Sequence, residues 1–190
     1  MGKRFFITEK PSVAASFAEV LGLQISKSDR AKGYAESGDI IVSWCFGHLV
    51  TMAYPDAYDP AYKSWKTEHL PIIPKEYKYV VIPDKGIGKQ FEVIRSLMRR
   101  EDVNVVYACT DSGREGEYIF RLVYNQINCR KPAKRVWISS HTAEAVKKAE
   151  IILWDGFCHV HTGFVPDHVH AARISHPGAK IIVHPECPED

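Results

Sequence analysis

The chain has 190 residues, enough for one domain or for one domain with an appendage. Its hydrophobic fraction of 45% is ordinary for a globular protein, and no apolar run approaches the roughly 18–20 residues that a membrane crossing needs. Five cysteines at irregular spacing exclude a disulfide framework, and the first residues lead into a short strand in place of a signal peptide, so we expect a cytoplasmic protein.

The net charge of +2 conceals an asymmetry along the chain. Residues 1–150 hold 23 of the 25 Lys and Arg and 18 of the 23 Asp and Glu, whereas residues 151–190 are acidic overall and hold six of the nine histidines. We therefore predict a main domain over residues 1–150 and a separate appendage over residues 151–190.

The main domain alternates between strand-like and helix-like segments. A strand over 4–8 leads into a helix over 13–21, and a hairpin signal joins strands over 34–36 and 40–44. A long connector over 47–75 follows. The remaining predicted elements are strands over 78–82, 103–109 and 136–139 and helices over 88–100, 115–125 and 142–149. This alternation predicts an α/β fold with a mostly parallel sheet and helices on both faces.

The turn after the strand over 103–109 carries the most distinctive chemistry. Asp111, Glu115 and Glu117 crowd a run with two glycines, where ligands of open α/β sheets collect. Oxygen donors of this kind suit Mg²⁺. An alternative is that Asp111 caps the helix while the two glutamates favour its N-terminal dipole. Glu9 follows the first strand, and it would face Asp111 and Glu115 if the two strands are neighbours.

The pattern Asp-x-x-x-Glu-Gly-Glu after a strand, with Glu-Lys-Pro-Ser at residues 9–12, resembles the Toprim domain of type IA DNA topoisomerases, in particular the topoisomerase III branch. The resemblance runs from about residue 3 to residue 148. Further stretches carry it: 47–49, 58–60, Trp65, 70–74 and 135–140. It implies a Rossmann-like Toprim fold and single-strand DNA cleavage and religation.

The resemblance also implies roles for individual residues. Glu9, Asp111 and Glu115 match the acids that bind Mg²⁺, for which Mn²⁺ is a substitute, and Glu9 is implied in proton transfer to the leaving sugar oxygen. Lys10 and Arg114 are expected to contact phosphate. Two further candidates, Glu117 and His48, would support the site from behind the metal ligands.

Two departures from the family pattern matter. Gly113 stands where many members have a second Asp, which favours a one-metal site. No tyrosine lies in a Tyr-x-Arg-Thr-Asp context, so we expect a truncated module that does not cleave and reseal DNA alone and that contacts single-stranded DNA mainly through other domains. Eight basic residues would track a phosphate backbone or form an ordinary solvated surface, and we favour the surface: Arg99, Arg100, Arg114, Arg121, Arg130, Lys131, Lys134 and Arg135.

The appendage follows a different pattern. Residues 151–161 and 181–187 resemble part of quinolinate synthase, an iron–sulfur enzyme of NAD biosynthesis. This resemblance implies Cys158 as a cluster ligand and His161, His184 and Glu186 as substrate-site residues. Two cysteines are too few for a [4Fe–4S] cluster, so we expect none, and a zinc site lacks a fourth ligand. The pattern indicates a join between unrelated sequences near residues 147–152.

The leading hypothesis is thus a Toprim module that binds Mg²⁺. Two alternatives stay open. The chain is a fragment of the iron–sulfur enzyme, or it is a metal- or DNA-binding module without catalysis, because a fold does not by itself fix a function. The sequence says nothing about the oligomeric state.

Overall fold

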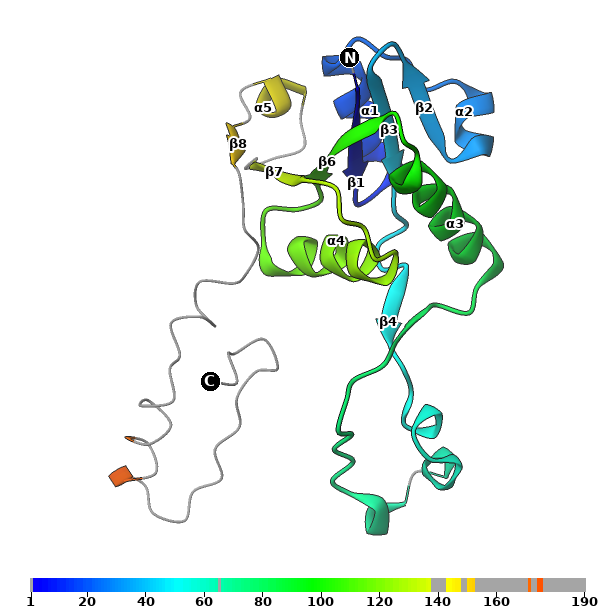
Figure 1. Cartoon of the computed structure of the whole chain (residues 1–190), viewed down its shortest axis with the longest axis vertical. Coiled ribbons are helices and arrows are strands. Elements are labelled where there is room, and N and C mark those ends of the chain that lie inside the picture. Colours follow the sequence, from blue (N-terminus) through cyan, green and yellow to red (C-terminus); the bar gives the residue numbers. More distant parts are fainter. Residues whose placement is uncertain are drawn as a thin grey trace. The chain divides into compact units, whose positions relative to one another are not determined.

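The computed structural model describes residues 2–64, 66–137, 143–147, 150–152, 171, 174 and 175. The chain divides into two compact units, Met1–Leu153 and Trp154–Asp190. Almost all described residues belong to the first unit. Figure 1 shows the elements of the first unit in chain order.

A six-stranded sheet forms the centre of the first unit, with the strand order β2-β3-β1-β6-β7-β8. Its strands are β1 (Lys3–Thr8), β2 (Tyr34–Ser37), β3 (Ile40–Trp44), β6 (Val103–Cys109), β7 (Ala133–Trp137) and β8 (Glu150–Ile152). The four inner strands β3, β1, β6 and β7 run parallel to one another, and the edge strands β2 and β8 pair antiparallel with β3 and β7. The predicted α/β fold with a mostly parallel sheet is confirmed.

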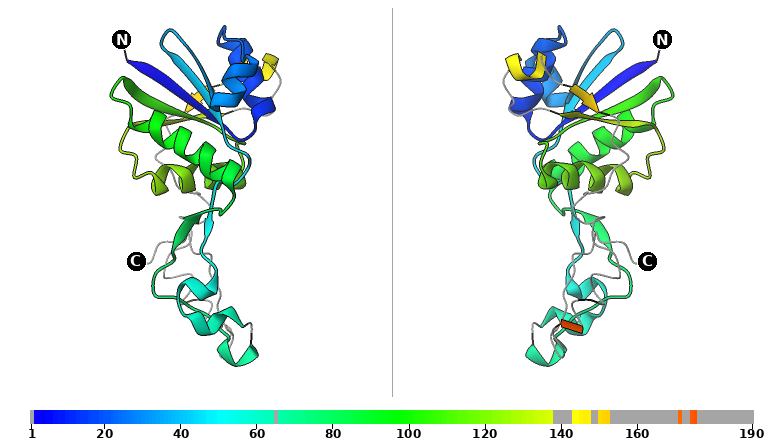
Figure 2. Two further views of the ribbon diagram at one scale, coloured as in Figure 1. Left: turned by 90° about the vertical axis from the view of Figure 1, so that its right-hand side faces the viewer. Right: turned by 90° about the vertical axis from the view of Figure 1, so that its left-hand side faces the viewer.

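The inner strands are apolar because both faces of the sheet are covered. Phe5 and Ile7 of β1 are buried on one face against α3 (Lys85–Arg99) and α4 (Arg114–Gln126). Phe6 is buried on the other face among residues of α1 (Pro11–Val20) and α5 (Ala143–Lys147). Figure 2 shows these helices on the two sides of the sheet. The prediction of helices on both faces is therefore correct.

Local capping explains where several helices begin. The Asp84 side chain accepts a hydrogen bond from the Ile87 amide, so α3 starts three residues before the predicted position. A short helix, α2 (Lys27–Lys32), was not predicted from the sequence because it buries no residue. Ser26 and Asp29 form a capping box at its start, and Gly33 ends it in the left-handed conformation.

The predicted connector contains more structure than expected. Strands β4 (Val50–Met52) and β5 (Tyr79–Val81) pair antiparallel in a separate two-stranded sheet. Between them lie three 3₁₀-helices, η1 (Pro55–Ala57), η2 (Pro60–Lys63) and η3 (Thr67–His69). We call residues 53–78 the arm. No helix among the described residues has the length and apolar character to cross a membrane.

Candidate active site at the carboxyl ends of two strands

Glu9 and Asp111 leave the sheet at the same edge. In the parallel β1–β6 pair, Thr8 lies opposite Cys109, so the residues that follow both strands emerge side by side. Glu9 is only 8% exposed, and its carbonyl oxygen accepts a hydrogen bond from the Gly47 amide at 3.1 Å. The loop after β3 is therefore hydrogen-bonded to the edge of the sheet at which β1 and β6 end. Ligands of open α/β sheets bind at this carboxyl edge.

Glu9 forms an ion pair with the residue that follows it. The Lys10 ammonium lies 3.0 Å from a carboxylate oxygen of Glu9, and this hydrogen bond and charge raise the pKa of Lys10. The Asp111 carboxylate contributes in the same direction. Lys10 thus remains a cation at the surface of the site, where the sequence analysis expected a phosphate contact.

Arg135 of β7 holds the turn that carries Asp111. Its side chain is 4% exposed, and it donates hydrogen bonds to the Thr110 carbonyl (2.8 Å), the Thr110 hydroxyl (2.9 Å) and the Asp111 carbonyl (3.3 Å). Its other terminal nitrogen pairs with the carboxylate of Glu117, which also receives Arg121 at 2.7 Å. Glu117 therefore links β7 to α4, a structural role that the sequence analysis described only as support.

Contacts within the protein engage three of the basic residues that the sequence analysis considered for a DNA surface. Arg135 is buried and engaged by the turn, so it cannot lie along a phosphate backbone. Arg100 forms a bidentate pair with Glu36, and the Lys131 ammonium donates to backbone carbonyls of Arg100 and Val103. Arg135 therefore fits neither of the two predicted roles, because it belongs to a solvated surface no more than to a phosphate track, whereas Arg100 and Lys131 are engaged by contacts within the protein.

The two glycines of the motif differ in the room that the structure leaves for a side chain. A Cβ on Gly116 would lie 2.1 Å from the Asp111 carbonyl oxygen, a backbone atom, so α4 can approach the turn this closely only without a side chain. The space around Gly113 is open, and Gly113 is the residue that caps α4, without a side-chain hydrogen bond. The alternative reading of Asp111 as the helix cap is therefore wrong.

Glu115 meets a residue 67 positions away in the sequence. Nε2 of His48 lies 2.5 Å from a carboxylate oxygen of Glu115, and the His48 ring packs edge-on against Tyr118 with 5.8 Å between centroids. His48 therefore contacts one of the predicted metal acids, and its role behind a metal ion stays a prediction. Arg114, at the start of α4, is exposed beside it.

The predicted metal acids share one edge of the sheet but do not converge on one point. Among the described residues, no three His, Cys, Asp or Glu side chains are placed to hold a metal ion together. Two of the three acids instead engage cations of the protein or a histidine, as given above for Glu9 and Glu115. The donor set itself, carboxylate oxygens beside backbone oxygens, is the set that Mg²⁺ prefers.

Two buried thiols near the site are chemically inert. Burial raises the pKa of Cys45 to about 12, with a further contribution from the Glu9 carboxylate, and burial also raises the pKa of Cys109. A thiol reacts as its thiolate, so neither residue is a nucleophile near neutral pH. The tail candidates Cys158, His161, His184 and Glu186 lie outside the described residues, so their predicted site stays a prediction.

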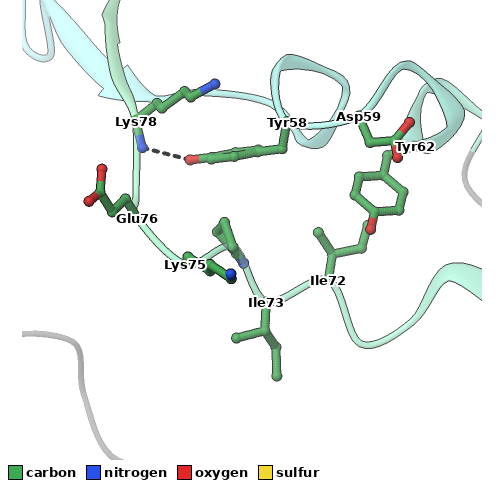
Figure 3. A pocket seen from close by; sticks show the side chains of 9 residues that line it. Tyr58, Asp59, Tyr62, Ile72, Ile73, Lys75, Glu76 and Lys78 are labelled. Atoms are coloured by element: carbon green, nitrogen blue, oxygen red, sulfur yellow. Dashed lines mark hydrogen bonds between the residues drawn. The ribbon is translucent and has the colours of Figure 1, made fainter.

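A separate hollow lies on the arm. It has a volume of about 450 Å³ and is lined by Tyr58, Asp59, Tyr62, Ile72, Ile73, Pro74, Lys75, Glu76 and Lys78. Figure 3 shows the ring of Tyr58 beside Lys78, whose backbone amide donates to the Tyr58 hydroxyl at 2.7 Å. None of the carboxylates described above lines this hollow.

Comparison with known proteins identifies two sequence families. The Toprim domain family matches residues 4–141, and the family described as Quinolinate synthetase A protein matches residues 130–190. A solved structure of full-length topoisomerase I from Thermotoga maritima gives a TM-score of 0.46 at 18% identity, covering 76% of this chain and 20% of that one.

Curated relatives named DNA topoisomerase 3 are more similar in sequence. The relative from Bacillus thuringiensis (strain Al Hakam) is 42% identical over 176 residues, which are 92% of this chain and 22% of the relative. The relative from Bacillus subtilis (strain 168) is 45% identical over 148 residues, 78% of this chain and 20% of the relative. The one from Staphylococcus epidermidis is 39% identical over 181 residues, 95% of this chain and 24% of the relative.

The chain thus spans about a fifth of the length of these relatives. A match over 92% of the chain also extends past residue 150, into the segment that the second family matches. The larger family match covers the sheet apart from the edge strand β8, both acidic turns and the Arg135 contacts described above. The chain therefore belongs to the Toprim domain family, and it is a Toprim module of the type found in type IA DNA topoisomerases.

Proposed function

We propose that this module binds Mg²⁺ and presents it to a DNA phosphate during single-strand cleavage and religation by a type IA topoisomerase. One observation carries the proposal: Glu9 and Asp111 emerge side by side from neighbouring parallel strands, and Glu115 follows on the helix after the second strand. Toprim domains generally bind Mg²⁺, and relatives named DNA topoisomerase 3 support DNA as the substrate.

Glu9, Asp111 and Glu115 would hold the ion. When bound, Mg²⁺ would neutralise phosphate charge and orient the DNA backbone. Mn²⁺ has similar ligand preferences and would replace it. Nε2 of His48 contacts one carboxylate oxygen of Glu115, so the other oxygen would bind the ion while His48 stays beside the site as a hydrogen-bonding neighbour. Because Gly113 contributes no carboxylate, the residues favour a single ion.

Positive groups around the acids would receive the DNA. Lys10 keeps its charge through its pair with Glu9, and Arg114 lies exposed at the N-terminus of α4, where the helix dipole also favours an anion. The Glu9 carboxyl, largely enclosed, would hold or release the proton that the leaving sugar oxygen takes up. Its low exposure suits a group that must exchange a proton with the substrate and not with bulk water.

Strand cleavage would need a tyrosine supplied from outside this sequence. None of its nine tyrosines lies in the Tyr-x-Arg-Thr-Asp context that the family resemblance implies. We expect the pure chain to bind single-stranded DNA weakly and with strong salt dependence, and to leave a supercoiled plasmid unrelaxed. Efficient relaxation by the chain alone would contradict this part of the proposal. We place this activity in the cytoplasm, which the lack of a disulfide framework supports.

Isothermal titration with Mg²⁺ and with Mn²⁺ tests the metal site. We expect the chain to bind one ion and Asp111→Asn to abolish the binding heat. Asp102→Asn is the matched control, because Asp102 lies immediately before β6, at the opposite end of that strand, and pairs with Arg100. Equal binding by all three proteins would place the ion elsewhere. If none of the three proteins binds an ion, the module has no metal site of its own.

The match of the Quinolinate synthetase A family to residues 130–190 supports a second candidate function, that of an iron–sulfur fragment. Anaerobic reconstitution with iron and sulfide tests it. We expect the protein to stay colourless because two cysteines in that segment are too few for a cluster. A brown protein that absorbs in the visible range would favour the second candidate.

A further inference from the structure

Among the described residues, exposed large apolar side chains gather in the arm, which holds four of them, and directly beside it, where Phe46, Met52 and Val80 lie. Seven of the nine exposed large apolar side chains lie between residues 46 and 80. Ile73 is 75% exposed and Leu70 is 61% exposed. Single exposed apolar residues are ordinary, whereas several gathered in one segment indicate an interaction site. The clustering of exposed apolar side chains in one segment therefore indicates a surface that a partner covers.

The arm also has no core of its own. None of its 3₁₀-helices buries a residue. It is held by the bond from the Ala53 amide to the Lys78 carbonyl, by the Lys78 contacts to Tyr58 and the Ala57 carbonyl, and by the edge-on contact of Tyr62 with His69. Burial supplies most of the free energy that offsets chain ordering. A segment ordered without burial is typical of one that completes its packing against a partner.

The chemistry of the hollow favours a polypeptide as the partner. Tyr58, Tyr62 and Ile72 supply aromatic and aliphatic groups, Ile73 lies at the edge with its side chain pointing outward, and charged residues of both signs complete the lining (Figure 3). Across the arm, four Lys are balanced by four Asp and Glu. A surface without excess positive charge has little attraction for a phosphate backbone. Its volume of about 450 Å³ accommodates one large apolar side chain together with its neighbours.

The length of the relatives indicates which polypeptide is the partner of the arm. They contain the arm within a match that spans about a fifth of their length, so four-fifths of a topoisomerase polypeptide is available to cover it. The arm also starts at the proposed site: His48, which contacts Glu115, lies two residues before β4, and β4 and β5 pack on α4. A partner seated on the arm would therefore stand close to the metal acids.

We propose that the arm is a docking surface for another part of a type IA topoisomerase polypeptide, which inserts an aliphatic or aromatic side chain into the hollow. This inference rests on the proposed function. Active sites form preferentially between domains, and docking on the arm would bring a second domain to the edge of the sheet that carries Glu9 and Asp111. The arm would thus fix where the missing chemistry is supplied.

A binding measurement tests the docking directly. The partner is the part of the Bacillus subtilis relative that the match does not cover, and circular dichroism with a cooperative melt shows whether it is folded. We expect the chain to bind it, and Leu70→Asp with Ile73→Asp to weaken binding about tenfold or more. Ile174→Asp is the matched control, since Ile174 is 80% exposed but lies outside the arm. Equal binding by all variants, or no binding to a folded partner, would overturn the proposal.

A hybrid enzyme gives a second readout should the partner not fold alone. Residues 1–148 of this chain replace the matched part of the full-length Bacillus subtilis relative. The arm substitutions should lower Tm of the hybrid by about 3–6 °C and leave Tm of the 190-residue chain unchanged, because the exposed side chains bury nothing there. Equal Tm values for the hybrid with and without the arm substitutions would overturn docking.

Other occupants and the proposed function give distinguishable results. Arm-dependent dimerisation of the chain, or arm-dependent binding of a single-stranded oligonucleotide, would replace the topoisomerase polypeptide as the occupant and overturn the proposal. A hybrid that shows the Tm effect but neither binds Mg²⁺ nor cleaves DNA would refute the proposed function and retain the docking surface. A hybrid that cleaves DNA regardless of the arm substitutions, with no change in Tm, would refute the docking alone.

Discussion

Replacement of Arg135 by methionine tests whether the buried guanidinium holds the Asp111 turn. Methionine keeps a long apolar side chain against Phe120 but removes every donor. The Thr110 carbonyl, the Thr110 hydroxyl and the Asp111 carbonyl then lose the bonds from Nη1. We expect lower stability and weaker Mg²⁺ binding, because the turn that carries Asp111 loses its link to β7.

The structure sets the size of the effect. Removal of one partner from a buried ion pair costs about 3–5 kcal/mol when the other charge is left unpaired. Here Glu117 keeps Arg121 at 2.7 Å and its side chain is 25% exposed, so its own contribution is smaller. The lost charge-assisted bonds to the buried turn contribute about 1–3 kcal/mol. We therefore expect about 2–4 kcal/mol in total, or a fall in Tm of about 5–12 °C.

Urea unfolding followed by tryptophan fluorescence measures the difference. Arg95→Met is the control, because Arg95 pairs with Glu92 on the exposed surface of α3, and it should cost less than about 0.5 kcal/mol. A double-mutant cycle with Glu117→Gln should give a coupling of about 1 kcal/mol or more. Equal free energies of unfolding for the Arg135 and Arg95 variants would refute the reasoning.

Three further predictions concern the glycines of the turn and one surface carboxylate. Gly116→Ala should destabilise by more than about 2 kcal/mol because its Cβ would clash with the Asp111 carbonyl, whereas Gly113→Ala should change stability by less than about 0.5 kcal/mol; thermal melts compare them. Gly113→Asp should raise Mg²⁺ affinity in calorimetry about tenfold by adding an oxygen ligand beside Asp111; unchanged affinity would place the ion away from this turn. Glu36→Gln should cost less than about 1 kcal/mol at pH 7. Its hydrogen bonds to Arg100 lower the pKa of Glu36 in the folded protein, so this stabilisation is present above the unfolded pKa of about 4.3 and disappears as pH falls through the lower folded pKa. Urea melts from pH 7 to pH 2.5 measure it, and a pH-independent difference would contradict it.

The sequence alone determined the elements that depend on short-range pattern. The buried strand before Asp111 is encoded in a continuous apolar run, and the helices with an apolar face are encoded in a period of 3.6 residues; neither pattern needs tertiary information. The placement of Glu9 and Asp111 at one edge was predicted on the condition that their strands are neighbours, because parallel neighbouring strands end on the same side, and the structure meets that condition. Helix α2 was missed because a helix that buries nothing leaves no periodic signal.

Only the tertiary structure decided which charged residues belong to the interior. Arg135 looks like any other basic residue in the sequence, yet it is 4% exposed and bonded to a turn some 24 residues earlier. Likewise, the family resemblance named His48 and Glu115 as candidates for one site, but only the structure shows that they contact each other across 67 residues. Composition and periodicity describe neighbours along the chain, whereas burial and ion pairing depend on which distant segments the sheet brings together. That physical difference separates what could be predicted for this protein from what had to be seen.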